Sequence, residues 1–148
     1  MNPDFCDMLS AFNEAGVEYL VVGAYALAAH GLVRSTGDID LWVRPTAENA
    51  TRVMRALRKF RAPLGDLTEV DLHTPDIVFQ MGLPPRRIDI LTSIANVQFE
   101  EAWVGRKLTH VSGIDFPVLG RTMLVKNKSA TGRAKDLADV EWLNENLE

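Results

Sequence analysis

The chain contains the stretch Val21-Val22-Gly23-Ala24-Tyr25-Ala26-Leu27-Ala28-Ala29-His30-Gly31, followed after a polar turn by Gly37-Asp38-Ile39-Asp40-Leu41-Trp42-Val43. This stretch predicts a strand, a short helix and a second strand. The apolar run over 19–22 is rich in strand formers, and Gly23 follows it where the backbone must turn sharply. The run over 25–30 is too rich in alanine for a strand, and Gly31 can supply a left-handed helix end.

The second strand carries a pair of acids. Side chains two residues apart on a strand point to the same face, so Asp38, Asp40 and Trp42 share one side. The other side carries Ile39, Leu41 and Val43, which predicts a core face. Two carboxylates ~4 Å apart cost about 4 kcal/mol at an effective dielectric of ~20. A shared proton can offset this repulsion, and so can a hard divalent cation that prefers oxygen ligands.

Length and composition are typical of one globular domain, so we expect a single domain over 1–148. The net charge of −4 disfavours a large nonspecific nucleic-acid surface. The N-terminus lacks a signal-like pattern, and no run of about 18 apolar residues occurs. Cys6 is the only cysteine, which excludes an internal disulfide. These features together predict a cytoplasmic protein without a membrane partner.

The order of the remaining elements predicts an α+β fold, in which a mixed β-sheet is flanked by helices and the C-terminus is helical. We expect helices over 3–15, 45–61 and 99–106, strands over 77–81 and 87–91, and a hairpin formed by 108–111 and 114–119. The pattern is helical again from 122, with a break over 129–132. The predicted inward stripe of the last helix is Leu137, Val140, Leu143 and Leu147.

A third acid lies inside an apolar strand pattern. In the run 87–91, Asp89 points away from Ile88 and Ile90, so we expect its strand to lie beside Asp38 and Asp40. Asp71 and Asp76 are rivals for the same role, but neither lies inside an apolar strand. Alternatively, Asp89 is an edge-strand acid that pairs with Arg86 or Arg87.

Gly23-Ala24, then thirteen residues, then Asp38-Ile39-Asp40-Leu41 resembles the signature of the nucleotidyltransferase superfamily, which has the polymerase-beta-like fold. That signature has a hydrophobic residue, Gly, and Gly or Ser before the spacer, and Asp, a hydrophobic residue, and Asp or Glu after it. Ala24 departs from this signature, which has Gly or Ser at that position. Alanine keeps the amide N–H but offers no hydroxyl. The stretch 126–137 is similar to small members of the superfamily, including antitoxin and abortive-infection types.

The resemblance implies that Asp38, Asp40 and Asp89 are catalytic and hold two Mg²⁺ ions, for which Mn²⁺ can substitute. Asp38 and Asp40 would contact both ions, and Asp89 the ion that activates the acceptor. The nucleotide-binding residues that the resemblance implies are Gly23, Ala24, Tyr25, Arg34, Thr36, Lys126 and Lys128. As residues alone, Arg34, Lys126 and Lys128 can equally be solvated surface side chains.

The activity expected from the resemblance is transfer of a nucleoside monophosphate from a nucleoside triphosphate (NTP) to an acceptor hydroxyl. The acceptor is left open between RNA, a protein side chain and a small molecule, and a partner protein or a second copy of the chain can contribute to it. A second hypothesis follows from Ala24 and the small size of the chain. It is a catalytically weak or inactive nucleotidyltransferase-like module that binds a partner, as in a toxin–antitoxin or phage-defence pair.

Overall fold

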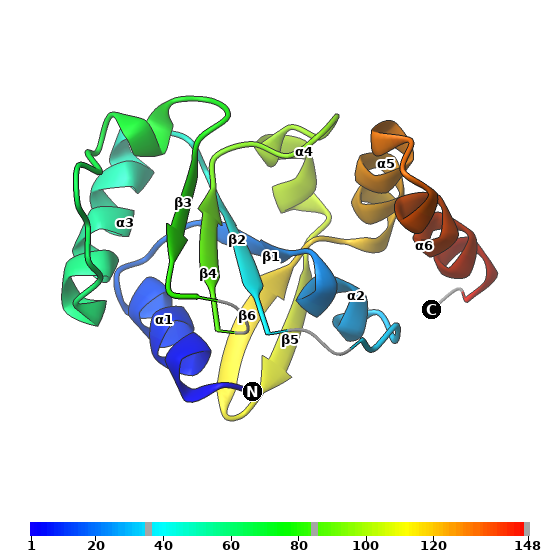
Figure 1. Ribbon diagram of the computed structural model, residues 1–148, viewed down its shortest axis with the longest axis horizontal. Helices are drawn as coiled ribbons and strands as arrows, with labels where there is room; N and C mark the ends of the chain where they lie inside the picture. Colours follow the sequence, from blue (N-terminus) through cyan, green and yellow to red (C-terminus); the bar gives the residue numbers. More distant parts are fainter. Residues whose placement is uncertain (35–36, 84–85, 147–148) are drawn as a thin grey trace.

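A computed structural model describes residues 1–34, 37–83 and 86–146 of the chain. Within these residues a six-stranded mixed sheet has the strand order β3-β4-β2-β1-β6-β5 (Figure 1). The pairs β1–β6 and β2–β4 are parallel, and the pairs β1–β2, β3–β4 and β5–β6 are antiparallel. The strands are β1 (Tyr19–Val22), β2 (Ile39–Val43), β3 (Val78–Met81), β4 (Ile88–Leu91), β5 (Lys107–Val111) and β6 (Ile114–Val118).

Helices flank this sheet, as the sequence predicts. Helices α1 and α3 pack against each other, and so do α5 and α6, which stand beyond α2 and α4 (Figure 1). The helices are α1 (Pro3–Glu14), α2 (Ala24–Ala29), α3 (Ala47–Phe60), α4 (Phe99–Val104), α5 (Arg121–Thr131) and α6 (Ala134–Glu145), with a 3₁₀ turn η1 (Asp71–His73). None of the helices in the described part of the chain has the length and apolar character of a membrane span.

Local sequence signals set the ends of these helices. The side chain of Asn2 caps α1, and Pro3 follows it as the first helical residue. Thr46 caps α3 by accepting a hydrogen bond from the Asn49 amide at 3.2 Å. Gly132 adopts the left-handed conformation that ends α5 and turns the chain into α6. The predicted helix starts near residues 3 and 46 are confirmed. The predicted break over 129–132 is confirmed only at its end, because α5 continues through Thr131 and the chain turns at Gly132.

The apolar side of β2 faces the first helix. The ring of Tyr19 on β1 meets Phe12 of α1 edge-on, with the two ring centroids 5.1 Å apart. Tyr19 is the register partner of Val43, and strand alternation puts Ile39 and Leu41 on the same face. Because all three β2 residues are at most 1% exposed, this side is core, as predicted.

The opposite face of β2 is only partly open. Trp42 shares this face with Asp40 but is 1% exposed, because Phe99 at the start of α4 packs edge-on against it at 5.0 Å. Asp40 lies nearer the start of the strand and lines a cavity that reaches α6. Helix α4 therefore seals one end of the acidic face and leaves the carboxylates at the other end accessible.

The inward side of α6 differs from the predicted stripe. Leu137 is 47% exposed, so its predicted inward position is wrong. The buried positions of the helix are Asp136, Asp139 and Leu143, which are three and four residues apart and share one helical face. The predicted burial of Leu143 is confirmed, but two carboxylates with cationic partners share its buried face, for which the prediction named only aliphatic residues. Leu147 lies outside the described residues.

Candidate active site

The three predicted acids come together at one end of β2 and β4. These strands are adjacent and parallel, and Asp40 is the direct register partner of Asp89. Asp38 lies just before β2, which starts at Ile39, and accepts a hydrogen bond from the Arg87 amide at 3.3 Å. All three acids line a single cavity of about 430 Å³.

The rival acids lie elsewhere. Asp71 belongs to η1 and its carboxylate accepts a hydrogen bond from the Thr68 amide at 3.0 Å. Asp76 donates its own amide to Ser93 at 3.0 Å, in the segment before β3. Neither lines the cavity of the other acids. The choice of Asp89 over these two therefore agrees with the position of β4 in the sheet.

The close approach of Asp40 leaves no room for a side chain at position 23, which is glycine. Register pairing of Val22 with Asp40 brings the end of β1 against the acid. A Cβ atom at position 23 would lie 2.5 Å from Oδ2 of Asp40, and the φ angle of Gly23 is +71°. Both the close approach and the left-handed backbone favour glycine. Gly23 and Ala24 line the same cavity as the acids.

Electrostatics at Asp40 reflect the crowding of acids. Burial raises the pKa of the Asp40 carboxyl, and the charge of Asp89, a hydrogen bond with Asp89 and the charge of Asp38 raise it further. The Arg87 guanidinium acts in the opposite direction, and the resulting pKa is about 6. An additional cation beside Asp40 would therefore stabilise the ionised form of its carboxyl group.

Arg87 is the cation that lies among the acids. Its Nε atom is 2.9 Å from Oδ1 of Asp89, and its Nη2 atom is 3.2 Å from Oδ2 of the same carboxylate. Nη2 also lies 3.5 Å from Oδ2 of Asp38. Both predicted interpretations of Asp89 hold in part, because it stands beside Asp40 and also pairs with Arg87, although β4 is an inner strand.

The three carboxylates suit a hard divalent cation, because they offer only oxygen ligands. The ionised form of Asp40 is also destabilised by its acidic neighbours, so a cation beside it would be favourable. As the side chains stand, no three His, Cys, Asp or Glu residues in the described ranges are gathered closely enough to ligate a metal. In this arrangement the guanidinium of Arg87 contacts oxygen atoms of both Asp38 and Asp89.

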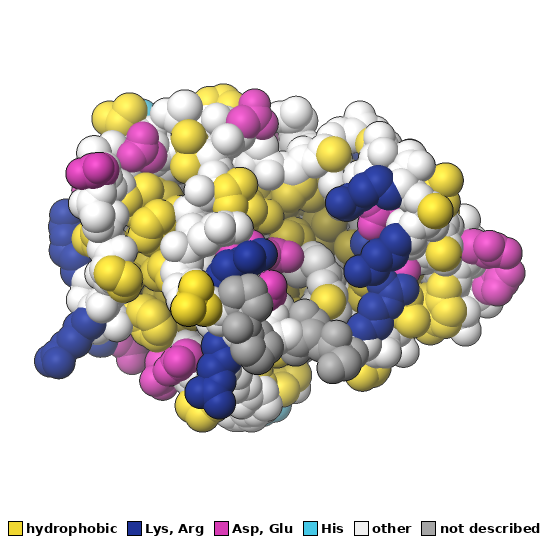
Figure 2. Space-filling model, viewed as in Figure 1, with side chains coloured by type: hydrophobic (Ala, Val, Ile, Leu, Met, Phe, Trp, Pro, Cys, Tyr) yellow, Lys and Arg dark blue, Asp and Glu magenta, His cyan; other side chains and the backbone are white. Residues whose placement is uncertain are grey.

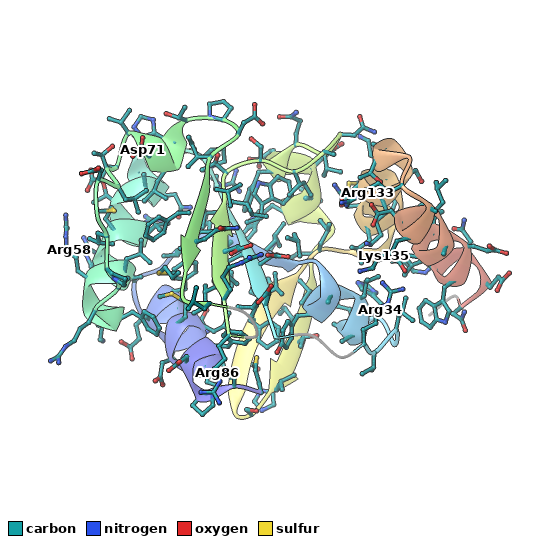
Figure 3. All side chains as sticks on the ribbon, in the orientation of Figure 1. Arg34, Arg58, Asp71, Arg86, Arg133 and Lys135 are labelled. Atoms are coloured by element: carbon teal, nitrogen blue, oxygen red, sulfur yellow. The ribbon has the colours of Figure 1, made fainter. Side chains whose placement is uncertain are left out.

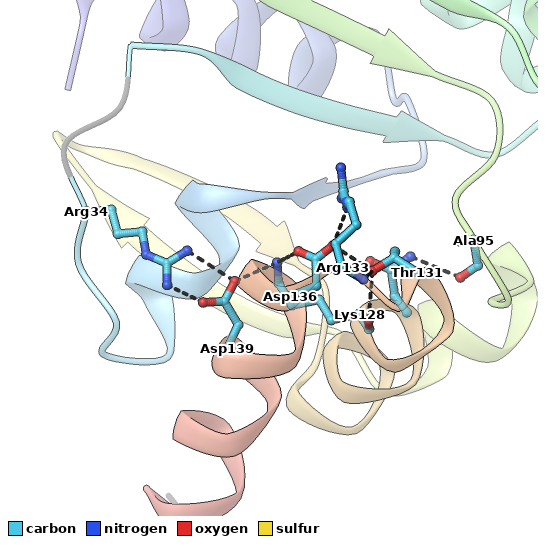
Figure 4. Close-up of polar contacts among 8 residues, drawn as sticks. Arg34, Ala95, Lys128, Thr131, Arg133, Asp136 and Asp139 are labelled. Atoms are coloured by element: carbon cyan, nitrogen blue, oxygen red, sulfur yellow. Dashed lines mark hydrogen bonds and ion pairs between the residues drawn. The ribbon is translucent and has the colours of Figure 1, made fainter.

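A cationic wall from the C-terminal helices faces these acids (Figure 2). Lys128 of α5 reaches Oδ2 of Asp139 at 2.9 Å and Oδ1 of Asp136 at 3.2 Å. Arg34, from the segment after α2, pairs with the Asp139 carboxylate through both terminal nitrogens (Figure 4). Arg133 pairs with Asp136 at 2.7 Å. The two buried aspartates of α6 thus hold three cations at the cavity.

The two α6 acids are ionised in this network. Burial alone raises the pKa of Asp136, but hydrogen bonds from Thr131, Arg133 and Lys128 outweigh it and lower that pKa to about 2. Burial likewise raises the pKa of Asp139, and hydrogen bonds from Arg34 and Lys128 outweigh it, so the pKa is lowered overall. Both carboxylates therefore stay negative at any ordinary pH and fix the cations opposite them.

The predicted nucleotide-binding residues divide into two groups. Gly23, Ala24, Arg34 and Lys128 line the cavity. Lys126 does not, because it is exposed and pairs with Glu101 of α4 at 2.9 Å. The predicted contribution of Tyr25 is its backbone at the start of α2. Tyr25 is not among the residues that line the cavity, and its ring meets that of Phe5 edge-on, with centroids 5.8 Å apart. Thr36 lies outside the described residues.

The sequence predictions left out three residues that line the cavity, Arg133, Lys135 and Asp136, and named Arg87 only as an alternative partner of Asp89. Arg34, Arg133 and Lys135 lie around the opening of the cavity between α2 and α6 (Figure 3). The sequence does contain a pattern that indicates Asp136 and Asp139. These acids are three residues apart, and Asp139 is four residues before Leu143, so all three lie on one face of the helix, which is buried. A charged pair on that face indicates buried cationic partners.

A second cavity of about 310 Å³ adjoins the first at Asp40. It shares Gly23, Asp40 and Lys128 with the first cavity. Its further lining includes apolar side chains, which are Leu91 at the end of β4, Ile94 and Ala95 after that strand, and Leu124 of α5. Among the three acids Asp40 therefore lies where the first cavity meets a partly apolar one.

Solved structures share this architecture. The lincosamide antibiotic adenylyltransferase LnuA, in its lincomycin-bound form, superimposes with a TM-score of 0.64 and 13% identity, over 99% of this chain and 98% of LnuA. TM1012 of Thermotoga maritima, provisionally described as a nucleotidyltransferase, gives a TM-score of 0.61 and 16% identity, over 95% of this chain and 91% of that one. No protein-family model matches the sequence, and no curated protein matches it significantly.

The strand order, the flanking helices and these likenesses establish the fold: the chain has the nucleotidyltransferase fold. Within that fold, the expected signature residues Gly23, Asp38 and Asp40 lie together in space.

Proposed function

We propose that the chain is a metal-dependent nucleotidyltransferase, which moves a nucleoside monophosphate from an NTP to an acceptor hydroxyl. The observation that carries the proposal is the convergence of Asp38, Asp40 and Asp89 on one cavity, opposite a wall of fixed cations. In the reaction, the acceptor oxygen bonds to the α-phosphorus, the bond from that phosphorus to the bridging oxygen breaks, and pyrophosphate leaves. The hydroxyl proton passes to solvent.

The acids would hold Mg²⁺, with Asp38 and Asp40 contacting two ions and Asp89 one of them; Mn²⁺ can replace it. When bound, such ions lower the pKa of an attacking hydroxyl and offset charge on phosphate oxygens. The chain's own part is to supply oxygen ligands on two adjacent strands. Gly23 supports this part, because it leaves room for the Asp40 carboxylate beside the turn into α2.

The cationic wall would bind the triphosphate. Lys128 and Arg34 are held by Asp139 at the cavity, and Arg133 and Lys135 stand at its opening. Phosphoryl-group transfer depends mostly on positioning and on charge neutralisation, which fixed cations provide. Ala24 lines the cavity, and alanine has a backbone amide but no hydroxyl to offer a phosphate.

The acceptor is open between RNA, a protein side chain and a small molecule. The small-molecule class is supported by LnuA, an adenylyltransferase acting on a lincosamide antibiotic, and by the partly apolar second cavity beside Asp40. The LnuA comparison also favours ATP as donor. A partner protein or a second copy of the chain can add to the acceptor surface.

The proposal is tested with α-labelled ATP and Mg²⁺ against a panel of RNA, protein and small hydroxyl-bearing acceptors. Wild type should transfer label to at least one acceptor class, and Asp38→Ala and Asp40→Ala should remove the transfer while circular dichroism shows a retained fold. Glu141→Ala on the exposed side of α6 is the control. Transfer that persists in both aspartate variants would contradict the assignment of the site.

A second function is favoured by one observation. In the present arrangement Arg34 and Lys128 are paired with Asp139, and Arg87 with Asp89, so the charges expected to meet phosphates and metal are mutually neutralised. A catalytically weak or inactive binding module, such as the antitoxin of a toxin–antitoxin or phage-defence pair, fits this state. Copurification of a tightly bound protein together with no calorimetric response to MgATP would favour that function.

A further inference from the structure

Arg87 occupies the middle of the acid cluster and contacts two of its three members. The guanidinium makes two hydrogen bonds to the Asp89 carboxylate, at 2.9 and 3.2 Å, in the fork arrangement that arginine forms with carboxylates. The same group lies 3.5 Å from Asp38. Arg87 directly precedes β4, and its carbonyl accepts a hydrogen bond from the Ile39 amide at 3.0 Å, which holds it beside the start of β2.

The contacts of Arg87 with Asp89 and Asp38 hinder the binding of another cation to these carboxylates. The Asp89 side chain is 8% exposed and that of Asp38 31% exposed, so Asp89 is shielded from bulk water and Asp38 is only partly covered. A guanidinium keeps its charge at every ordinary pH. A divalent ion approaching Asp38 and Asp89 therefore meets a resident positive charge and oxygens already engaged in hydrogen bonds.

We propose that Arg87 is a resident counter-ion of the acid cluster, which a divalent metal must displace from Asp89 and Asp38 in order to bind. Arg87 is then a positioning residue that sets the metal affinity of the site. The inference rests on the proposed function for the identity of the metal ligands. What it adds is that the Arg87 guanidinium and the divalent metal compete for the carboxylates of Asp38 and Asp89. The displaced side chain, 30% exposed, already lines the cavity and has room to move into it.

The neighbouring Arg86 provides a matched control. It carries the same charge one position earlier but is exposed and points away from the acids, near α1 (Figure 3). It is not among the residues that line the cavity. Removing either arginine changes the net charge of the chain equally, so a difference between the two variants reports the contacts of Arg87.

The experiment measures Mn²⁺ binding without nucleotide, by calorimetry and by the loss of the free Mn²⁺ signal in electron paramagnetic resonance. Loss of a unit charge in contact with two ligands should tighten Mn²⁺ binding by Arg87→Met at least about tenfold. Arg86→Met should stay within about twofold of wild type, as expected for an exposed charge. Arg87→Lys, which keeps the charge but loses the fork, should lie between wild type and Arg87→Met.

Equal or weaker Mn²⁺ binding by Arg87→Met would overturn the inference, and so would equal tightening by Arg86→Met, because net charge alone would then explain it. Urea unfolding of each variant shows that the binding data come from folded protein. Asp40→Asn separates the two claims. If its Mn²⁺ affinity equals that of wild type, the metal site of the proposed function is wrong, whereas an effect of Asp40→Asn without an effect of Arg87→Met removes only the role of Arg87.

Discussion

Asp40 of β2 and Asp89 of β4 are direct register partners on adjacent parallel strands, with their carboxyl groups on the same face of the sheet. Parallel pairing is possible only because the segment between the two strands, residues 44–87, crosses over through α3 and β3 before β4 begins. The pair is unfavourable in isolation, as the raised pKa of Asp40 indicates. Such a placement of two acids is typical of a site that receives a cation.

Gly23→Ala should destabilise the fold by about 2–4 kcal/mol, since a side chain there adds left-handed backbone strain and a clash with Asp40. Gly16→Ala is a close control, because Gly16 has the same φ of +71° but no atom within 4 Å of the place that a Cβ would occupy. It should cost about 1 kcal/mol. Urea unfolding measures both, and equal costs would show that the approach to Asp40 is unimportant.

Asp139→Ala should cost about 3 kcal/mol, because Lys128 and Arg34 lose a fully buried partner. The Lys128 side chain is 12% exposed and cannot regain full hydration without moving. Glu141→Ala, on the exposed side of the same helix, should change stability by no more than about 0.5 kcal/mol. The free energy of unfolding at pH 7 distinguishes the two, and a small effect of Asp139→Ala would indicate that α6 is held mainly by Leu143.

Stability should fall in acid through the α6 carboxylates. The pKa of Asp136 is about 2 in the folded chain against an ordinary value near 3.8, so the folded state binds this proton less readily than the unfolded state. The stabilisation is complete above about pH 4 and is lost as pH falls toward 2. Unfolding free energies measured from pH 5 to pH 2 should decline less steeply for Asp136→Asn than for wild type. Parallel curves would contradict the folded-state pKa.

Lys128 and Lys126 should differ in nucleotide binding, although both are basic residues of α5. Lys128→Met should weaken calorimetric binding of a nonhydrolysable ATP analogue with Mg²⁺ about tenfold, since it removes a charged group that lines the cavity. Lys126→Met should bind within about twofold of wild type, because Lys126 pairs with Glu101 outside that cavity. A larger loss for Lys126→Met would place the triphosphate elsewhere.

Much of the fold was predictable because the signals are local. Thr46, Gly132 and the alternation around Asp40 each act within a few residues, and the elements that they predict are present. The pairing of β2 with β4 was also predictable, since Asp89 repeats the pattern of an acid among aliphatic residues.

The cationic side of the site was not predictable in the same way, because it depends on contacts between distant segments. Arg34 and Asp139 are 105 residues apart, and Lys126 and Lys128 differ only in which side of α5 they occupy. The rotation of α6 depends on these contacts as well, so Leu137 was assigned to the wrong side.

The central claim is tested most directly by a crystal structure of the chain with Mg²⁺ and a nonhydrolysable ATP analogue. We predict metal density bound by Asp38, Asp40 and Asp89, the triphosphate against Lys128, and the Arg87 guanidinium moved off Asp89. An ordered analogue bound away from these acids, or acids still paired with Arg87 at saturating Mg²⁺ and analogue, would contradict the account.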